Sequence, residues 1–123
     1  MTDGFWYLGS PYTNFPDGHA TAYDLACRAA ASLIRAGFVI FSPIAHSHSL
    51  VAHGLDGTDP DLWKRQDAPL VAAAKGMIVV MIPGWAESAG VQHEIAEFRC
   101  AGKPVLYYEM DLRGNEGIIH ESR

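Results

Sequence analysis

Short apolar runs alternate along this chain with longer segments of helical periodicity, and this alternation restricts the possible folds more than any other feature. In the clearest run, from Met77 to Ile82, every residue is apolar, and Pro83 follows it directly. Three further runs of this kind cover residues 5–9, 38–41 and 105–108. Strands that are apolar on both faces and separated by helices are typical of a parallel sheet with helices on both sides. The alternation therefore predicts an α/β fold.

The segments between the apolar runs predict helices and one long loop. Helical spacing of apolar residues is found at 20–36, 60–75 and 88–101. Pro69 lies inside the second of these segments, so a kink or a restart of the helix is expected there. Residues 42–59 are rich in glycine, proline and histidine and are expected to form a long loop. The polar tail, 109–123, has no clear pattern.

The composition predicts a single folded domain and excludes two classes of partner. The chain has 123 residues, of which 49% are hydrophobic and 19% charged, so we expect one domain over residues 1–123. Nine Lys and Arg are scattered among 14 Asp and Glu, so a nucleic-acid polymer is not an expected partner. The longest apolar stretch is far shorter than the roughly 20 residues that a membrane span requires.

The cysteine content and the N-terminal residues indicate the cellular compartment. Cys27 and Cys100 both fall in predicted helices and are expected to be free, reduced thiols, because a disulfide framework needs more cysteines in so short a chain. The first residues carry no basic segment followed by an apolar one, as a secretory signal would. These features predict a cytoplasmic protein.

The most informative segment, 83–94, joins the strongest strand to a helix. Ser88 is a good helix N-cap, and Gly90 would expose backbone in the first turn. Helical spacing places Glu94 at the edge of the apolar stripe, where its carboxylate would lie over the sheet. A half-exposed glutamate paired with Lys or Arg explains the same spacing, and periodicity alone favours that interpretation.

Asp67, on the preceding predicted helix, also has two interpretations. It could cap a helix that restarts before Pro69, which the spacing slightly favours, or it could be the partner of Glu94. Two carboxyl groups whose environments separate their pKa values can divide the roles of nucleophile and acid.

Further candidates lie next to the ends of predicted strands. Tyr7 is either a core residue or a hydroxyl that orients a carboxylate. Gly9 and Ser10 begin a turn that could offer backbone N–H groups to an anion, although it is neither a dinucleotide fingerprint nor a P-loop. Trp63 and Trp85 could stack on a planar base or pack at the rim of a site.

Three histidines, His46, His48 and His53, share the predicted loop with Asp56. Imidazoles and a carboxylate are suitable zinc ligands, so a metal-dependent hydrolase is an alternative. The companion H-E-x-x-H pattern is absent, which favours contact with substrate or solvent instead. We therefore expect neither a metal nor a cofactor.

Taken in order, five segments resemble the nucleoside 2-deoxyribosyltransferase superfamily, which includes nucleoside 5′-monophosphate N-glycosidases. The segments are YLGSPY at 7–12, FSP at 41–43, Asp67, SAGVQHE at 88–94 and GKPV at 102–105. The resemblance implies a small doubly wound sheet, Rossmann-like or flavodoxin-like, of four to five parallel strands with helices on both faces. It also implies a homodimer or a larger homo-oligomer.

The resemblance assigns roles to individual residues. Glu94, the last residue of the G-x-x-x-E element, corresponds to the nucleophile. Asp67 corresponds to the residue that protonates the leaving base or orients the sugar, and Tyr7 to the one that holds the nucleophile. Ser88 stands where the monophosphate hydrolases have serine and some transferases have aspartate, which favours the hydrolases. The loop 10–19 lacks the arginine that those hydrolases carry.

The resulting prediction is cleavage of an N-glycosidic bond, by hydrolysis or deoxyribosyl transfer, in a nucleoside or its 5′-monophosphate. The expected catalytic residues are Glu94, Asp67 and Tyr7, and the expected substrate contacts are Gly9, Ser10, Ser42, Trp85, Ser88 and Gly90. The alternative is a nucleotide-binding sensor of the same fold that does not cleave its ligand.

Overall fold

Five strands form one sheet in the order β2-β1-β3-β4-β5. The computed structural model describes residues 4–111 and 117–121. The strands are β1 Trp6–Gly9, β2 Ile40–Phe41, β3 Gly76–Val80, β4 Val105–Glu109 and β5 Ile118–His120. The first four are parallel, and β5 runs antiparallel to β4. The predicted α/β class is confirmed, with a sheet that is parallel except at one edge.

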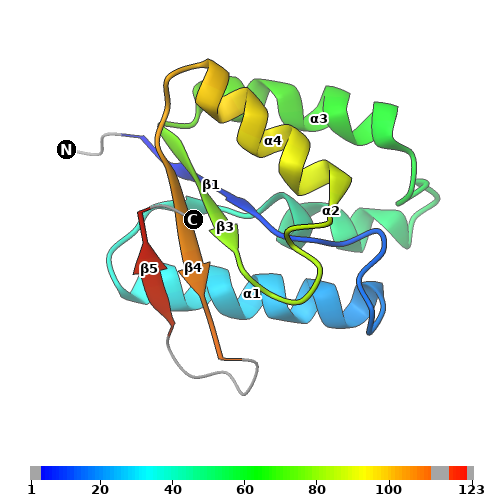
Figure 1. Cartoon of the computed structure of the whole chain (residues 1–123). Helices are drawn as coiled ribbons and strands as arrows, with labels where there is room; N and C mark the ends of the chain where they lie inside the picture. Colours follow the sequence, from blue (N-terminus) through cyan, green and yellow to red (C-terminus); the bar gives the residue numbers. More distant parts are fainter. Residues whose placement is uncertain (1–3, 112–116, 122–123) are drawn as a thin grey trace.

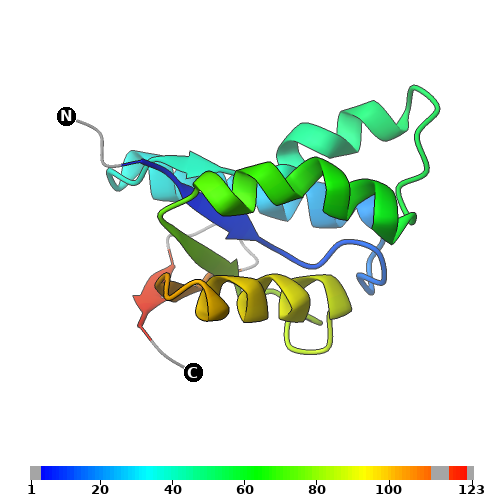
Figure 2. The same ribbon diagram turned by 90° about the horizontal axis from the view of Figure 1, so that it is seen from above.

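Helices cover both faces of this sheet. They are α1 His19–Arg35, α2 Pro43–Val51, α3 Pro60–Ala73 and α4 Ala89–Cys100. Figures 1 and 2 show α1 on one face, and α3 and α4 side by side on the other. No helix in the described ranges is long and apolar enough to cross a membrane. Cys27, in α1, and Cys100, in α4, are free, as expected.

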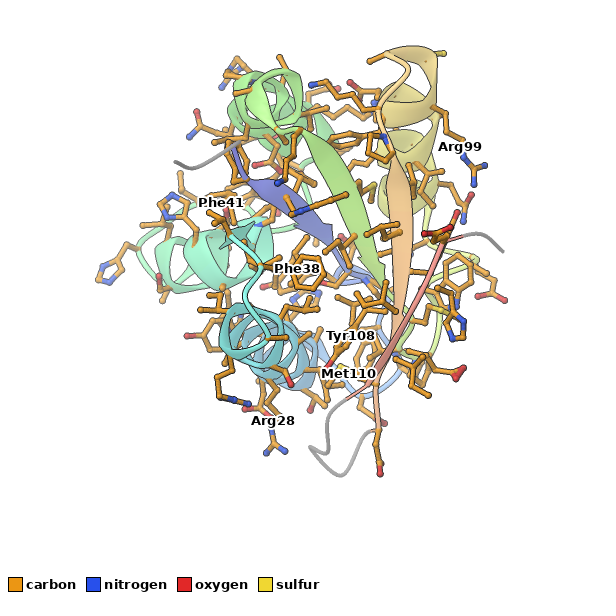
Figure 3. All side chains as sticks on the ribbon, turned by 90° about the vertical axis from the view of Figure 1, so that its left-hand side faces the viewer. Arg28, Phe38, Phe41, Arg99, Tyr108 and Met110 are labelled. Carbon is orange, nitrogen blue, oxygen red and sulfur yellow. The ribbon has the colours of Figure 1, made fainter. Side chains whose placement is uncertain are left out.

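The core has two parts because β3 is buried on both faces. Ile78 and Val80 pack with Leu25 and Leu33 of α1, whereas the alternate residues of β3 pack on the other side. That second cluster comprises Tyr7, Met77, Val79, Val91, Ile95 and Phe98, among others. In Figure 3, Phe38, Tyr108 and Met110 lie on the α1 side of the sheet, and Arg28 extends away from it.

Residues 43–51 form a helix, α2, where a loop was expected, so that prediction was wrong. The Ser42 side chain accepts a hydrogen bond from the Ala45 N–H at 3.1 Å, and Pro43 occupies the first turn. A serine cap followed by proline is a signal for a helix start, but the glycine, proline and histidine content of residues 42–59 favoured a loop. The predicted strand 38–41 is correspondingly short and lies at the sheet edge, where Val39 is 48% exposed.

Helix α3 is continuous through Pro69, so of the kink or restart expected there, the restart does not occur. Its N-cap is Asp59, whose carboxylate accepts from the N–H groups of Asp61 and Leu62. Asp67 therefore lies inside the helix and does not cap it. Its carboxyl group remains available for other contacts.

The chain order reverses between β1 and β3, which are neighbours in the sheet. After β1, the chain passes through α1 to β2 on one side, and β3 then pairs with the other side of β1. In doubly wound sheets, a crevice for ligands forms at this reversal, beyond the carboxyl ends of the two strands. In this chain those ends are Gly9 and Val80.

Replacing Gly76 by alanine is expected to destabilise the fold by about 1–3 kcal/mol, measured by denaturant unfolding. A Cβ at Gly76 would lie 2.8 Å from the Pro104 carbonyl oxygen and 2.5 Å from the ring of Trp6. Gly90→Ala is the matched control, because its Cβ would meet only Ser88 Oγ at 4.0 Å. Equal stability of the two variants would contradict the packing described for β3.

Candidate active site

A cleft of about 450 Å³ lies beyond the carboxyl ends of β1 and β3. Residues 10–16, α2, α3 and the N-terminal half of α4 line it. These segments are on the right in Figure 1. The cleft therefore lies where the strand order leads us to expect a ligand. Both acidic residues singled out by the sequence, Glu94 and Asp67, line it.

Glu94 and Asp67 meet at the hydroxyl of Tyr7. Tyr7 is fully buried, and its ring packs on Phe98 with the ring centroids 5.6 Å apart. Its hydroxyl donates a hydrogen bond to Glu94 Oε2, and the Asp67 carboxyl lies close enough to that hydroxyl to raise its pKa. Core packing thus fixes the Tyr7 hydroxyl between the carboxyl of Glu94, from α4, and that of Asp67, from α3.

Gly9 lies against the Met77 side chain and close to the Glu94 carboxyl. A Cβ at Gly9 would lie 2.3 Å from the Met77 methyl carbon and 3.6 Å from Glu94 Oε1. The end of β1 is therefore close to the carboxyl of Glu94. Gly9 itself does not line the cleft, whose lining begins at the next residue, Ser10.

The two carboxyl groups titrate well above their ordinary range. Burial raises the pKa of Glu94 to about 8, the Tyr7 hydrogen bond opposes this shift, and the nearby Asp67 carboxylate adds to it. Burial also raises the pKa of Asp67 to about 6, against the lowering effects of Tyr7 and His46. Burial and the two adjacent carboxylates raise the pKa of Tyr7, so the phenol stays protonated. Groups with such displaced pKa values in a cleft are typical of catalytic acids and bases.

Hydroxyl and backbone N–H groups lie next to the carboxyl pair. Ser88 caps α4, accepting a hydrogen bond from the Val91 N–H at 3.3 Å, as the sequence predicted. Gly90 is exposed in the first turn, where helix N–H groups have no acceptor within the helix. Ser10 is only 7% exposed, and its Oγ has no hydrogen-bond partner within the described parts of the chain. Ser10, Ser88 and Gly90 all line the cleft, so the cleft offers unused donors to a polar ligand.

Three predicted substrate contacts, Gly9, Ser42 and Trp85, do not line the cleft. Ser42 is buried and its hydroxyl is engaged as the cap of α2. The Trp85 ring packs edge-on against Tyr107, with the ring centroids 5.6 Å apart, and borders the core beneath α4. The other tryptophan considered for stacking, Trp63, does line the cleft, and its indole N–H donates to the Asp56 carbonyl at 2.9 Å.

One wall of the cleft is formed by the loop after β1 and by α2. The sequence predicted a substrate contact at Ser10 and contact of the histidines with substrate or solvent, but it singled out neither Tyr12 nor the helix that carries His48. Tyr12 and His48 both line this wall, and a hydrogen bond of 2.7 Å joins them. Recognition of Ser42 and Pro43 as a helix start would have placed His48 on a helix. Within the described ranges, no group of three His, Cys, Asp or Glu could hold a metal ion. The histidines of α2 thus do not converge with His53 and Asp56 as a ligand set.

Comparison with known families identifies one match. A family model described as a domain of unknown function (DUF1937) matches residues 4–110, which is most of the chain. The match includes all four helices, the first four strands and every residue of the carboxyl pair and its surroundings. A search of curated proteins gives no match.

Proposed function

We propose that this chain, which belongs to the DUF1937 family, cleaves the N-glycosidic bond of a nucleoside or nucleoside 5′-monophosphate. The observation that carries the proposal is the pair of carboxyl groups, Glu94 and Asp67, around one buried phenol in the cleft. Two carboxyl groups that can divide nucleophilic and acidic roles are the usual machinery for glycosidic bonds. The resemblance of the sequence to the 2-deoxyribosyltransferase superfamily supports the same chemistry.

In this mechanism the Glu94 carboxylate attacks the anomeric carbon as the bond to the base breaks. The transition state has oxocarbenium character, and a covalent glycosyl-enzyme ester forms. The leaving base takes the proton of Asp67, which becomes a carboxylate. Water then hydrolyses the ester with Asp67 as base, or a second base displaces the sugar. Tyr7 holds the Glu94 carboxyl at the angle that attack requires.

Ser10, Ser88 and Gly90 suit the sugar side of the substrate. The unpartnered Ser10 hydroxyl and the first N–H groups of α4 can donate to sugar hydroxyls or to a 5′-phosphate. A nucleoside or nucleotide is thus the small-molecule partner in this proposal. The proposal also includes a cytoplasmic homo-oligomer, which the two free cysteines and the resemblance support.

The pH dependence of kcat/KM is expected to be bell-shaped, with limbs near pH 6 and pH 8, the two values of the carboxyl pair. Below the lower limb both carboxyls are protonated and no nucleophile exists. Above the upper limb both are ionised and no acid remains. Between the limbs the pair shares one proton, which lies mainly on Glu94 because its pKa is the higher. The active form, with Glu94 ionised and the proton on Asp67, is the less populated of the two singly protonated forms.

Initial rates across the pH range, on wild type and on Asp67→Asn, test this expectation. Loss of Asp67 removes one titrating member of the pair, so one limb should disappear. A wild-type kcat/KM that does not change across this pH range would contradict the assignment of the two pKa values to the reaction.

A chromatographic screen for free base tests the function itself. The protein is incubated with ribo- and deoxyribonucleosides and their 5′-monophosphates, each with and without a second base as acceptor. Free base without an acceptor identifies a hydrolase, and a new nucleoside formed only with acceptor identifies a transferase. Ligand binding without release of base would instead favour a nucleotide-binding module and would overturn the proposal.

A further inference from the structure

His48 is held rigidly in the cleft wall by two aromatic neighbours. Its Nδ1 and the Tyr12 hydroxyl are 2.7 Å apart. Its ring stacks on Tyr23 of α1, with the ring centroids 4.4 Å apart and 19° between the planes. The hydrogen bond at the edge of the His48 ring and the stacking on its face fix both the position and the tilt of the imidazole.

The hydrogen bond to Tyr12 also selects the tautomer of His48. Burial raises the pKa of Tyr12, so its phenol keeps its proton and has one hydrogen to donate. Within the described residues, its hydroxyl has no other hydrogen-bond partner than His48 Nδ1. Donation from Tyr12 to Nδ1 satisfies both groups and leaves the ring proton of the neutral imidazole on Nε2.

The Nε2–H group is an unused donor in an apolar frame. Within the described parts of the chain, this nitrogen has no hydrogen-bond partner. Ile44 and Val51, four residues before and three after His48, share its face of α2 and also line the cleft. Apolar surface with one fixed donor suits a planar heteroaromatic ring that carries an acceptor on its edge.

We propose that His48 recognises the leaving base, donating its Nε2–H to a carbonyl oxygen or ring nitrogen on the edge of the base. This inference rests on the proposed function. The carboxyl pair comes from α3 and α4, whereas His48 comes from α2, so sugar chemistry and base recognition use different walls of the cleft. Electron density builds on the base as the glycosidic bond breaks, so a fixed donor stabilises the transition state more than the bound substrate.

Two substitutions at His48 separate donation at Nε2 from a merely structural role. The amide of glutamine reaches the place of Nε2, whereas that of asparagine reaches only the place of Nδ1. His48→Asn is expected to lower kcat/KM for base release about 10–100-fold, mainly through kcat, and His48→Gln to stay within about fivefold of wild type. Ser49→Ala, on the exposed side of α2, is the control and should be unchanged. Equal losses in the glutamine and asparagine variants, or none in either, would overturn the proposal.

Binding of free bases by calorimetry separates this inference from the proposed function. Adenine, hypoxanthine, cytosine and thymine are titrated into wild type and His48→Asn. At least one base should bind wild type, with its Kd raised about tenfold or more in the variant. If no substrate is turned over but His48→Asn still binds the base more weakly than wild type does, only the proposed glycosidase activity is refuted. Equal binding by both proteins, or no binding to wild type, would refute the role of His48.

Discussion

Replacing Glu94 by glutamine is expected to lower the rate of base release by at least about 10³-fold. The amide has the shape of the carboxyl group but cannot attack the anomeric carbon. The Tyr7 hydroxyl can still donate to the amide oxygen, so the packing around Phe98 should persist. The loss should therefore appear in kcat, with a circular dichroism spectrum like that of wild type.

Gln92→Ala is the matched control for this substitution. Gln92 lies on the same helix, is exposed and does not line the cleft, so its replacement should leave the rate unchanged. A Glu94→Gln protein that keeps its fold and turns over at the wild-type rate would exclude Glu94 as the nucleophile. The proposed mechanism would then fail.

The same substitution is expected to stabilise the fold in alkaline solution, by about 3 kcal/mol at about pH 9, or roughly 10 °C in Tm. In the folded protein the pKa of Glu94 is about 8, against an ordinary value of 4.5. As the pH rises between these values, the unfolded chain releases this proton and the folded chain does not. Stability falls across this window and stays low above it. Glutamine does not titrate, so the variant escapes the loss.

Thermal unfolding of wild type and Glu94→Gln, followed from about pH 4 to about pH 9, measures this difference. The two proteins should converge below the ordinary pKa of a glutamate and separate as the pH rises. Asp67→Asn should gain less, because the pKa of Asp67 rises only to about 6. A gain from Glu94→Gln that is the same at every pH would show that the Glu94 carboxyl is not held protonated by burial.

These two expectations connect the stability of the fold with its chemistry. Burial destabilises the ionised form of the Glu94 carboxyl. A cationic transition state that forms beside this carboxylate gives it a more favourable environment. The cost of burying Glu94 is thus expected to be a functional property of the cleft. Active sites commonly sacrifice stability in this way.

The sheet and one helix face could be predicted from local patterns. The run Met77–Ile82 identified β3 because both of its faces are buried, which leaves no polar alternation. Helical spacing placed Glu94 at the inner edge of α4, and the Ser88 cap fixed where that helix begins. Each of these features depends on residues within a few positions of one another.

Other features depend on contacts between distant segments and were not predictable in this way. Asp67 faces the cleft because α3 continues through Pro69, which propensity alone disfavours. The contact of Tyr7 with Glu94 joins residues 87 positions apart. The short strand β5 has no apolar alternation of its own and forms by pairing with β4. Tertiary contacts decided each of these cases.

The stereochemistry of the reaction tests the central claim, a covalent intermediate on Glu94, most directly. The protein is incubated with the best substrate of the screen in water containing methanol, and the sugar products are followed by proton NMR from the first turnovers. Two displacements at the anomeric carbon predict a methyl glycoside, and a first-formed free sugar, with the configuration of the substrate. Inverted products would show a single displacement by water or methanol and would contradict the role of Glu94 as nucleophile.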